Sequence, residues 1–392
     1  MYKILTLNNI AVEGLRHLPR ERYEVASEIT HPDAILLRSF NMHDWDIPDT
    51  VAAIGRAGAG TNNIPIDAMS ARGVPVFNAP GANANAVKEL VIAGLLIAAR
   101  NLCDAREHVR ALKESGDALN KAVEAGKKKF VGFELPGKTL GVIGLGAIGV
   151  EVANAALALG MNVIGFDPKI TVRRAWQLSA GVEHAETLDQ LFQHADAVTV
   201  HVPLMDATRN LINRDRLALM PTGGVVINFA RGGVADDEAV LAALDSGKLH
   251  AYVTDFPTDE TKSHPQVVAL PHLGASTAEA EENCAIMVAE NVKDFLENGN
   301  VRYSVNFPES RLPRLDAHRI TVANANVPNM VGQISTCLAN AGLNIEDLLN
   351  KSVGNLAYTI VDVNGPVSEE TMAAIRGVEG VLTLRNLGKP VT

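Results

Sequence analysis

Short apolar runs alternate with amphipathic stretches along most of the chain. Apolar runs bounded by turn-forming residues are typical of buried strands, and apolar positions three or four residues apart are typical of helices. In the first part of the chain, strands are predicted at 3–7, 23–25, 34–37, 51–54 and 74–77, with a helix at 66–71. This alternation predicts a first α/β domain.

A long helical region leads to a second α/β region. Helical periodicity covers residues 84–100 and continues, in more charged form, over 103–125. Beyond it, strands are predicted at 140–143, 162–166, 197–202, 225–229, 251–255 and 267–270, and helices at 150–159, 188–193 and 236–246. Strands and helices that alternate in this way predict a doubly wound parallel sheet.

The last part of the chain has a different order of elements. A helix over about 277–297 follows the second sheet, and we expect it to return to the first domain and make that domain discontinuous. Pro308 and Pro313 mark a linker. Strands at 320–323, 345–352, 356–363 and 381–384, with helices at 331–341 and 368–376, then follow the order βαββαβ of a ferredoxin-like domain. The expected domains are 1–98 with 277–312, then 99–276, then 313–392.

A glycine motif stands at the start of the second sheet. Gly144, Gly146 and Gly149 have the spacing G-x-G-x-x-G between a predicted strand and a predicted helix. Glycine at these places permits a tight turn, a close approach of the backbone to a diphosphate, and close packing of helix on strand. Asp167 ends the next strand about twenty residues on, where an acid binds the ribose 2′-hydroxyl of NAD. NAD is favoured over NADP, although basic neighbours such as Lys169 leave NADP open.

Composition argues against several classes of function. The 392-residue chain has a formal net charge of −10 and a pI near 5.6, which argues against nucleic acid as a partner. No apolar run is long enough to span a bilayer, and no signal-peptide pattern is present. Cys103, Cys284 and Cys337 lack the spacing of a metal site, so we expect buried free thiols and a reducing, cytoplasmic environment.

Three ionisable residues lie just beyond the last three predicted strands of the second sheet: Arg231, Glu260 and His272. Doubly wound sheets bind their ligands at the carboxyl ends of the strands. There an arginine can hold a carboxylate, a histidine can exchange a proton near neutral pH, and a glutamate can orient the imidazole. Spacing alone leaves open the alternative of a surface arginine, a buried histidine and a solvated glutamate.

Several stretches together resemble the D-2-hydroxyacid dehydrogenase family, and within it the branch that oxidises phosphoglycerate. These stretches are 35–39, 55–63, 76–81 with 89–91, the glycine motif to Asp167, 201–204, the turn at Arg231, 255–260 and 271–276. The resemblance covers nearly the whole chain. It implies a flavodoxin-like substrate domain, a Rossmann NAD domain and a C-terminal ACT domain.

The resemblance also implies roles for individual residues. Arg231, Glu260 and His272 are implied to be the catalytic arginine, acid and histidine, with Asp259 as a rival to Glu260. The implied NAD site comprises Gly144, Gly146, Ala147, Ile148, Gly149, Asp167, His201, Val202, Pro203, Thr208, Ala230, Asp255 and Gly274. Asp255 would hold the carboxamide. The implied substrate site comprises Arg38, Ser39, Arg56, Gly58 and Arg231, and no metal is implied.

The implied activity is the NAD-dependent oxidation of 3-phospho-D-glycerate to 3-phosphohydroxypyruvate, the first step of L-serine biosynthesis. His272 would accept the hydroxyl proton, Glu260 would stabilise the imidazolium and Arg231 would bind the carboxylate. Another 2-hydroxyacid dehydrogenase, such as a glyoxylate/hydroxypyruvate reductase, is the first alternative, because it needs no phosphate site. An NAD(H)-sensing corepressor is the second, and the acidic charge and the absence of a DNA-reading element oppose it.

The tail from about residue 317 resembles an ACT domain, a module that commonly binds amino acids between paired copies. Asn324, Asn326 and Asn344 occupy the places that serine-binding forms use, with Asn324 where those forms have histidine. A dimerisation module without a ligand is the alternative. We expect a homodimer or homotetramer, formed through the helical arm at 99–131 and the edge strands of the tail.

Overall fold

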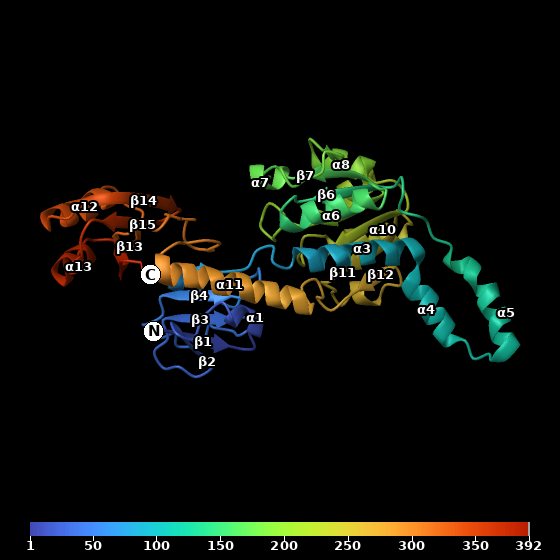
Figure 1. The fold of residues 1–392 in the computed structure, drawn as a ribbon. Helices are drawn as coiled ribbons and strands as arrows, with labels where there is room; N and C mark the ends of the chain where they lie inside the picture. Colours follow the sequence, from blue (N-terminus) through green and yellow to red (C-terminus); the bar gives the residue numbers. More distant parts are fainter. Residues whose placement is uncertain (391–392) are drawn as a thin grey trace. The chain divides into compact units, whose positions relative to one another are not determined.

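The computed structural model describes residues 1–390 and divides into two compact units. One unit comprises Met1–Ala82 together with the chain from Ala278 onward, and the other comprises Asn83–Thr277 (Figure 1). The first unit is therefore discontinuous in sequence. The three-domain division given above stays a prediction.

A five-stranded parallel sheet with the order β2-β1-β3-β4-β5 forms the N-terminal part of the first unit. Its strands are β1 (Tyr2–Leu7), β2 (Tyr23–Ala26), β3 (Ala34–Leu37), β4 (Ala53–Arg56) and β5 (Val76–Phe77), and its helices are α1 (Val12–Leu15), α2 (Ile66–Ala71) and α11 (Ala278–Asn298). Helix α11 packs closely on β4, because a Cβ on Gly55 would lie 2.7 Å from Val288 and 2.9 Å from Val292. The predicted return of this helix to the first sheet is confirmed.

A seven-stranded parallel sheet with the order β12-β11-β10-β9-β6-β7-β8 forms the second unit. Its strands are β6 (Thr139–Ile143), β7 (Asn162–Phe166), β8 (Val182–His184), β9 (Ala197–Val200), β10 (Gly224–Asn228), β11 (Leu249–Thr254) and β12 (Val267–Ala269). Its helices are α3 (Ala84–Arg100), α6 (Ala147–Ala158), α7 (Val172–Ala175), α8 (Leu188–His194), α9 (Arg214–Leu219), α10 (Asp237–Asp245) and the short η2 (Thr261–Ser263). Strand β8 carries one partly buried and two exposed side chains, so no apolar run predicts it.

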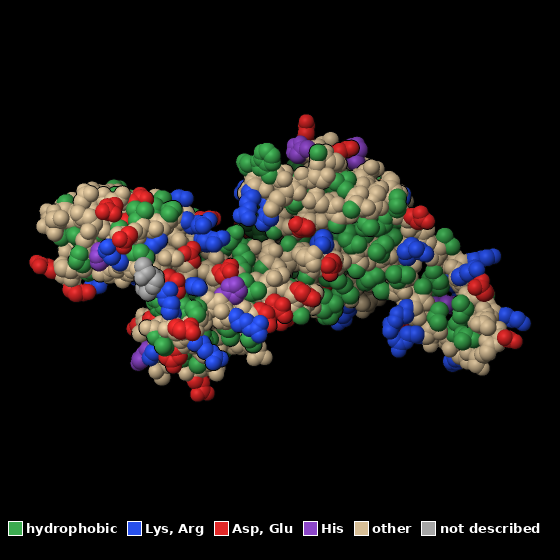
Figure 2. Space-filling model, viewed as in Figure 1, with side chains coloured by type: hydrophobic (Ala, Val, Ile, Leu, Met, Phe, Trp, Pro, Cys, Tyr) green, Lys and Arg blue, Asp and Glu red, His purple; other side chains and the backbone are tan. Residues whose placement is uncertain are grey.

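Two helices extend from the second sheet as an arm (Figure 1). The sequence predicts one continuous helix here, but the structure has α4 (Leu102–Ala111), α5 (Gly116–Gly126) and the short η1 (Lys127–Phe130). The continuous helix is wrong because Leu112 takes an extended conformation and Gly116 a left-handed one, with φ of 56°. Figure 2 shows Lys and Arg side chains over the arm, which contains Arg106, Arg110, Lys121, Lys127, Lys128 and Lys129.

The expectation of buried thiols is wrong for one cysteine. Cys284 is buried and Cys337 is partly buried, but Cys103 is exposed. Cys103 lies on α4, which buries none of its residues, so its apolar positions face no core within residues 1–390. Over the same residues, no helix is long and apolar enough to cross a membrane.

The C-terminal part of the first unit has the predicted βαββαβ order. Its elements are β13 (His318–Ala325), α12 (Met330–Asn340), β14 (Ile345–Val353), β15 (Leu356–Val363), α13 (Glu369–Arg376) and β16 (Val381–Gly388), and the antiparallel sheet has the order β14-β15-β13-β16. Ile320, Val361 and their neighbours form a core with α12 and α13. Tyr358 and Ile360 instead join the core that contains α11. Two parallel sheets and this antiparallel domain confirm the predicted fold class.

Two arginines attach this antiparallel sheet to the end of α11. Arg385 of β16 donates from Nη1 to the carbonyl oxygen of Phe295 and from Nη2 to that of Leu296, each over 2.9 Å. Arg319 of β13 is fully buried, forms two 2.6 Å bonds to Asp362, and donates to the carbonyl oxygen of Asn298 over 3.0 Å. The antiparallel sheet is therefore fixed to α11 by charge-assisted hydrogen bonds as well as by apolar contact.

Candidate active site and its relatives

Three adjacent strands of the second sheet carry the three candidate catalytic residues. β12, β11 and β10 are neighbours and run parallel, so their carboxyl ends lie at one edge of the sheet. Arg231 follows β10, Glu260 follows β11 and His272 follows β12. The topology therefore delivers an arginine, a carboxylate and an imidazole to the edge where doubly wound sheets bind ligands.

The turn that carries Arg231 is held by a residue that the sequence reasoning did not assign. Asn228 is buried, its Nδ2 donates to the carbonyl oxygen of Arg231 over 2.9 Å, and its Oδ1 accepts from the backbone N–H of Ala230 over 3.1 Å. The Arg231 side chain is exposed, and its Nη1 donates to the carbonyl oxygen of Ala230 over 2.7 Å. An amide that ends an otherwise apolar strand was the available signal for Asn228.

His272 and Glu260 are both exposed at this edge. The His272 backbone is left-handed, with φ of 56°, and its ring packs 4.8 Å from the ring of Phe256. Within residues 1–390 no hydrogen bond joins Glu260 to His272, and Asp259 instead pairs with Lys262. The acid–imidazole pair therefore stays a prediction, as does the choice between Glu260 and Asp259.

A further carboxylate lies close to this acidic loop. Asp237, at the start of α10, lies near Thr258, and burial raises the pKa of Asp237, with smaller contributions in the same direction from Asp236 and Glu260. Thr258 in turn exchanges hydrogen bonds with Thr261, for example from the Thr258 backbone N–H to Oγ1 of Thr261 over 2.8 Å. The loop is thus closed on itself by these bonds.

The glycine motif has the geometry that its spacing predicts. Gly144 has φ of 89°, and a Cβ on Gly149 would overlap the carbonyl oxygen of Gly144, so both positions require glycine to form the turn. Gly146 is different, because no atom lies within 4 Å of the position its Cβ would take. That open space at the start of α6 fits a dinucleotide phosphate that approaches the backbone.

Asp167 supports the same turn. Its Oδ2 accepts from the backbone N–H of Leu145 over 2.9 Å, and its Oδ1 accepts from that of Lys169 over 2.8 Å. The acid is therefore attached to the loop between Gly144 and Gly146. This places the predicted ribose-binding carboxylate beside the predicted diphosphate site.

Asp255 has one satisfied and one unsatisfied oxygen. Only 2% of the residue is exposed, Oδ2 accepts from the backbone N–H of Gly274 over 2.7 Å, and Oδ1 is buried with no hydrogen-bond partner. A buried carboxylate oxygen without a donor is costly. A carboxamide N–H of NAD is a donor that fits it.

The loop after β9 contains the remaining predicted cofactor residues. His201 bonds through Nε2 to Oγ1 of Thr199 over 3.0 Å, and its Nδ1 is buried without a partner. Burial lowers the pKa of His201 to about 3, so the ring is neutral at physiological pH. Thr208 closes the loop by donating to the carbonyl oxygen of Pro203 over 2.6 Å. The loop therefore has a defined shape before any ligand binds.

The predicted substrate arginines lie at the carboxyl ends of neighbouring strands of the first sheet. Arg38 follows β3 and Arg56 ends β4, and Nε of Arg56 donates to the carbonyl oxygen of Arg38 over 3.0 Å. Ser39 is exposed and Gly58 is buried against the Arg56 guanidinium. One further member of this group was not predicted from the sequence. It is Glu281 of α11, which forms a 2.6 Å ion pair with Arg38.

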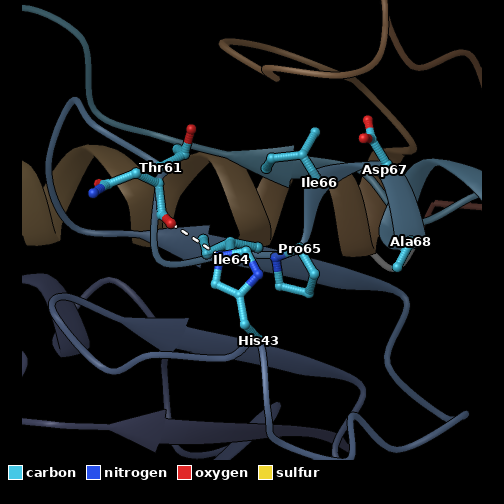
Figure 3. A pocket seen from close by; sticks show the side chains of 8 residues that line it. His43, Thr61, Ile64, Pro65, Ile66, Asp67 and Ala68 are labelled. Carbon is cyan, nitrogen blue, oxygen red and sulfur yellow. Dashed lines mark hydrogen bonds between the residues drawn. The ribbon is translucent and has the colours of Figure 1, made fainter.

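An open hollow of about 690 Å³ lies elsewhere on the first unit. Its lining consists of His43, Thr61, Asn62, Ile64, Pro65, Ile66, Asp67 and Ala68. Figure 3 shows His43 reaching toward the loop at Thr61, and its Nε2 lies 3.0 Å from the carbonyl oxygen of Asn62. None of the predicted site residues lines this hollow, so it is not the predicted substrate site.

The three asparagines predicted for an effector differ in exposure. Asn324 is 1% exposed, donates from Nδ2 to the carbonyl oxygen of Ala325 over 2.7 Å, and has a buried Oδ1 without a partner. Asn326 and Asn344 are exposed, and Asn326 donates to the carbonyl oxygen of Gly354 over 3.1 Å. Two of the three side chains are thus open to solvent.

Known proteins resemble this chain over most of its length. A family model described as "D-isomer specific 2-hydroxyacid dehydrogenase, NAD binding domain" matches residues 92–274. A D-3-phosphoglycerate dehydrogenase of Methanocaldococcus jannaschii is 35% identical over 93% of this chain and 69% of its own length. One of Escherichia coli K12 is 34% identical over 86% of this chain and 82% of its own length. Other relatives are longer, and the chain spans 56% of an Archaeoglobus fulgidus D-3-phosphoglycerate dehydrogenase.

Solved structures show the same relationship. An NAD⁺-bound 3-phosphoglycerate dehydrogenase of Entamoeba histolytica has a TM-score of 0.60 and 26% identity, over 78% of this chain and 98% of its own. A glyoxylate reductase of Paecilomyes thermophila has a TM-score of 0.61 at the same identity and coverage. With the NAD-binding domain model, the open phosphate turn and the unpaired oxygen of Asp255, these matches identify NAD as the cofactor. The chain belongs to the D-isomer specific 2-hydroxyacid dehydrogenase family and is an NAD-dependent dehydrogenase.

Proposed function

We propose that this enzyme is a D-3-phosphoglycerate dehydrogenase, which oxidises 3-phospho-D-glycerate to 3-phosphohydroxypyruvate as the first step of L-serine biosynthesis. The observation that carries the proposal is the pair Arg38 and Arg56 at adjacent strand ends, because two guanidinium groups suit a phosphoryl group. Relatives that bear this name in archaea and bacteria support it.

The chemistry assigned to the chain concerns a proton and a carboxylate. Bound NAD supplies the hydride acceptor. His272 accepts the proton of the substrate hydroxyl, and its exposed ring leaves that side open to a substrate. Arg231 binds the substrate carboxylate and polarises the oxygen at C2 as it becomes a carbonyl. Glu260 moves to the imidazole and stabilises its charged form, with Asp259 as the alternative acid.

The remaining predicted residues have supporting roles. Ala147, Ile148, Gly149, Val202, Ala230 and Gly274 contribute to the NAD site, and Ser39 and Gly58 contribute to the substrate site. Ala147, Ile148 and Gly149 begin helix α6 after β6, and the others lie in loops that follow strands of the two parallel sheets. The three cysteines form no disulfide, which is in keeping with the proposed cytoplasmic location.

A glyoxylate/hydroxypyruvate reductase is the second candidate. It is favoured by the glyoxylate reductase structure, which matches the chain as well as the phosphoglycerate dehydrogenase structure does. Such an enzyme requires no phosphate site. The two candidates therefore differ in what Arg38 and Arg56 bind.

The proposal includes a homodimer or homotetramer with an ACT-like tail. On the arm, Leu102, Val109 and Val131 expose 48%, 48% and 78% of their surface, which suits burial against a second copy. Asn326 and Asn344 are exposed for an amino acid such as L-serine, whereas Asn324 must turn outward to take part. A dimerisation module without a ligand remains the alternative for the tail.

The deciding experiment compares kcat/KM for NADH-dependent reduction of 3-phosphohydroxypyruvate, hydroxypyruvate and glyoxylate, each with and without L-serine. A preference of about a hundredfold for the phosphorylated substrate, equivalent to about 2.7 kcal/mol, supports the proposal. Equal values for the three substrates would move the function to a general reductase. Absence of turnover with all three would favour the dinucleotide-sensing alternative.

A further inference from the structure

Glu281 faces Arg38 at the carboxyl edge of the first sheet. Nη1 of Arg38 lies 2.6 Å from Oε1 of Glu281, and the two side chains are 35% and 45% exposed. Glu281 belongs to the first turn of α11, whereas Arg38 follows β3. The pair therefore joins the predicted phosphate-binding edge to the start of a helix that is distant in sequence.

The connected side chains of this cluster are two arginines and one glutamate. Arg38 and Arg56 provide two guanidinium groups, and the amino end of the 21-residue α11 adds partial positive charge. Nε of Arg56 donates to the carbonyl oxygen of Arg38, and Nη1 of Arg38 pairs with Glu281, so the three residues form one connected group. A dianion that binds Arg38 therefore also meets Glu281.

The ion pair between Arg38 and Glu281 is exposed to solvent, and this exposure limits how strongly the two charges hold each other. Pairs of exposed charges contribute little to folding stability, because water solvates each partner well when they separate. Glu281 can therefore leave Arg38 at small cost when another anion competes for the guanidinium. The same carboxylate repels that anion for as long as it stays nearby.

We propose that Glu281 is the internal counter-ion of Arg38, which the terminal anion of a substrate displaces, and that it sets the preference for phosphorylated over neutral-ended hydroxy acids. The proposal rests on the proposed function in that Arg38 is taken to bind the phosphoryl group. A phosphoryl dianion is attracted by the arginines and repelled by Glu281, whereas a neutral hydroxyl end experiences neither effect. Glu281 therefore makes the preference smaller than the two arginines alone would produce.

The test is the substitution Glu281→Gln, which keeps the size of the side chain and removes its charge. The ratio of kcat/KM for 3-phosphohydroxypyruvate to kcat/KM for hydroxypyruvate should rise about three- to tenfold at low salt. The gain should shrink in about 0.5 M salt, where charges on the surface are screened. Glu279→Gln is the matched control, because Glu279 is exposed in the same helical turn and forms no ion pair within residues 1–390, and it should leave the ratio unchanged.

A ratio that stays constant or falls in Glu281→Gln would show that Glu281 merely holds Arg38 in place, and would overturn the proposal. Inorganic phosphate provides a probe that does not depend on the natural substrate. Its inhibition constant against hydroxypyruvate reduction should fall about three- to tenfold in Glu281→Gln, and an unchanged constant would also refute the counter-ion role. If the wild-type enzyme shows no preference for the phosphorylated substrate but this constant falls, the proposed function fails while the counter-ion role stands.

Discussion

The backbone N–H of Gly274 donates a hydrogen bond of 2.7 Å to Oδ2 of Asp255. This bond connects the end of β11 with the segment that follows β12 and carries His272. It occupies one oxygen of a buried carboxylate and leaves the other, Oδ1, without a partner. Asp255 therefore holds the segment that carries His272, and its Oδ1 can still accept a hydrogen bond from a ligand.

Substitution of Asp255 by Asn should separate these two roles. The amide oxygen can still accept from Gly274, but its NH₂ group cannot accept from a carboxamide. We expect the dissociation constant for NADH to rise about ten- to hundredfold, equivalent to about 1.5–3 kcal/mol, with little change in melting temperature. Isothermal titration and thermal denaturation measure the two effects. The exposed Asp215→Asn is the control, and unchanged NADH affinity in Asp255→Asn would rule out the carboxamide role.

Two glycines of the same motif should respond differently to alanine. A Cβ on Gly149 would overlap the carbonyl oxygen of Gly144, so Gly149→Ala should lower the free energy of unfolding by about 1–3 kcal/mol. Gly146→Ala meets no atom within 4 Å and should keep its stability, but its methyl group should weaken NADH binding at least about tenfold. Chemical denaturation and NADH titration of both variants check this. Normal NADH affinity in Gly146→Ala would contradict the diphosphate assignment.

Replacement of His272 by Ala tests the proton-transfer role. The His272 ring is exposed, so its removal should leave the fold and NADH binding intact while kcat falls about 10²- to 10⁴-fold. Steady-state kinetics and NADH titration are the measurements. His264→Ala is the control, because His264 pairs with Asp245 and is not one of the candidate catalytic residues. Turnover within about twofold of the wild-type rate would remove His272 from the mechanism.

Arg385 should matter for stability rather than for chemistry. Arg385→Met keeps the apolar stem but leaves the carbonyl oxygens of Phe295 and Leu296 without their donors, so we expect a loss of about 2–4 kcal/mol of unfolding free energy. The exposed Arg376→Met serves as the reference. Equal stability of the two variants in urea denaturation would mean that the antiparallel sheet does not depend on this contact.

His201 should make the fold sensitive to acid. Its pKa is about 3 in the folded protein, against about 6.5 in the unfolded chain, because burial disfavours the charged ring. As pH falls below 6.5 the unfolded chain takes up a proton that the folded protein refuses, so stability declines progressively down to pH 3. At pH 5 the expected loss is about 1–2 kcal/mol relative to pH 8. His201→Gln should lose that part of the pH dependence, and an identical dependence in both proteins would disprove the assignment.

The local pattern of apolar and polar residues was sufficient to predict most strands and helices of both parallel sheets and of the antiparallel tail. Strands such as β9 and β10 are buried on both faces, so each appears in the sequence as an apolar run. The glycine spacing and Asp167 indicated the dinucleotide turn because each role depends on residues close in sequence. The same reasoning failed on the arm, where the apolar positions of α4 have no core to face within residues 1–390 and Cys103 is exposed.

The sequence by itself determined which residue types stand after which strands, and hence Arg231, Glu260 and His272 as candidates at one edge of a sheet. Only the tertiary structure revealed the partners: Asn228 under the Arg231 turn, and Glu281 on Arg38. Helical and strand periodicity reflect neighbours a few positions apart along the chain. A contact such as that of Arg38 with Glu281 instead depends on the order of strands in a sheet and on where a distant helix packs. Neither property can be predicted from a local sequence pattern.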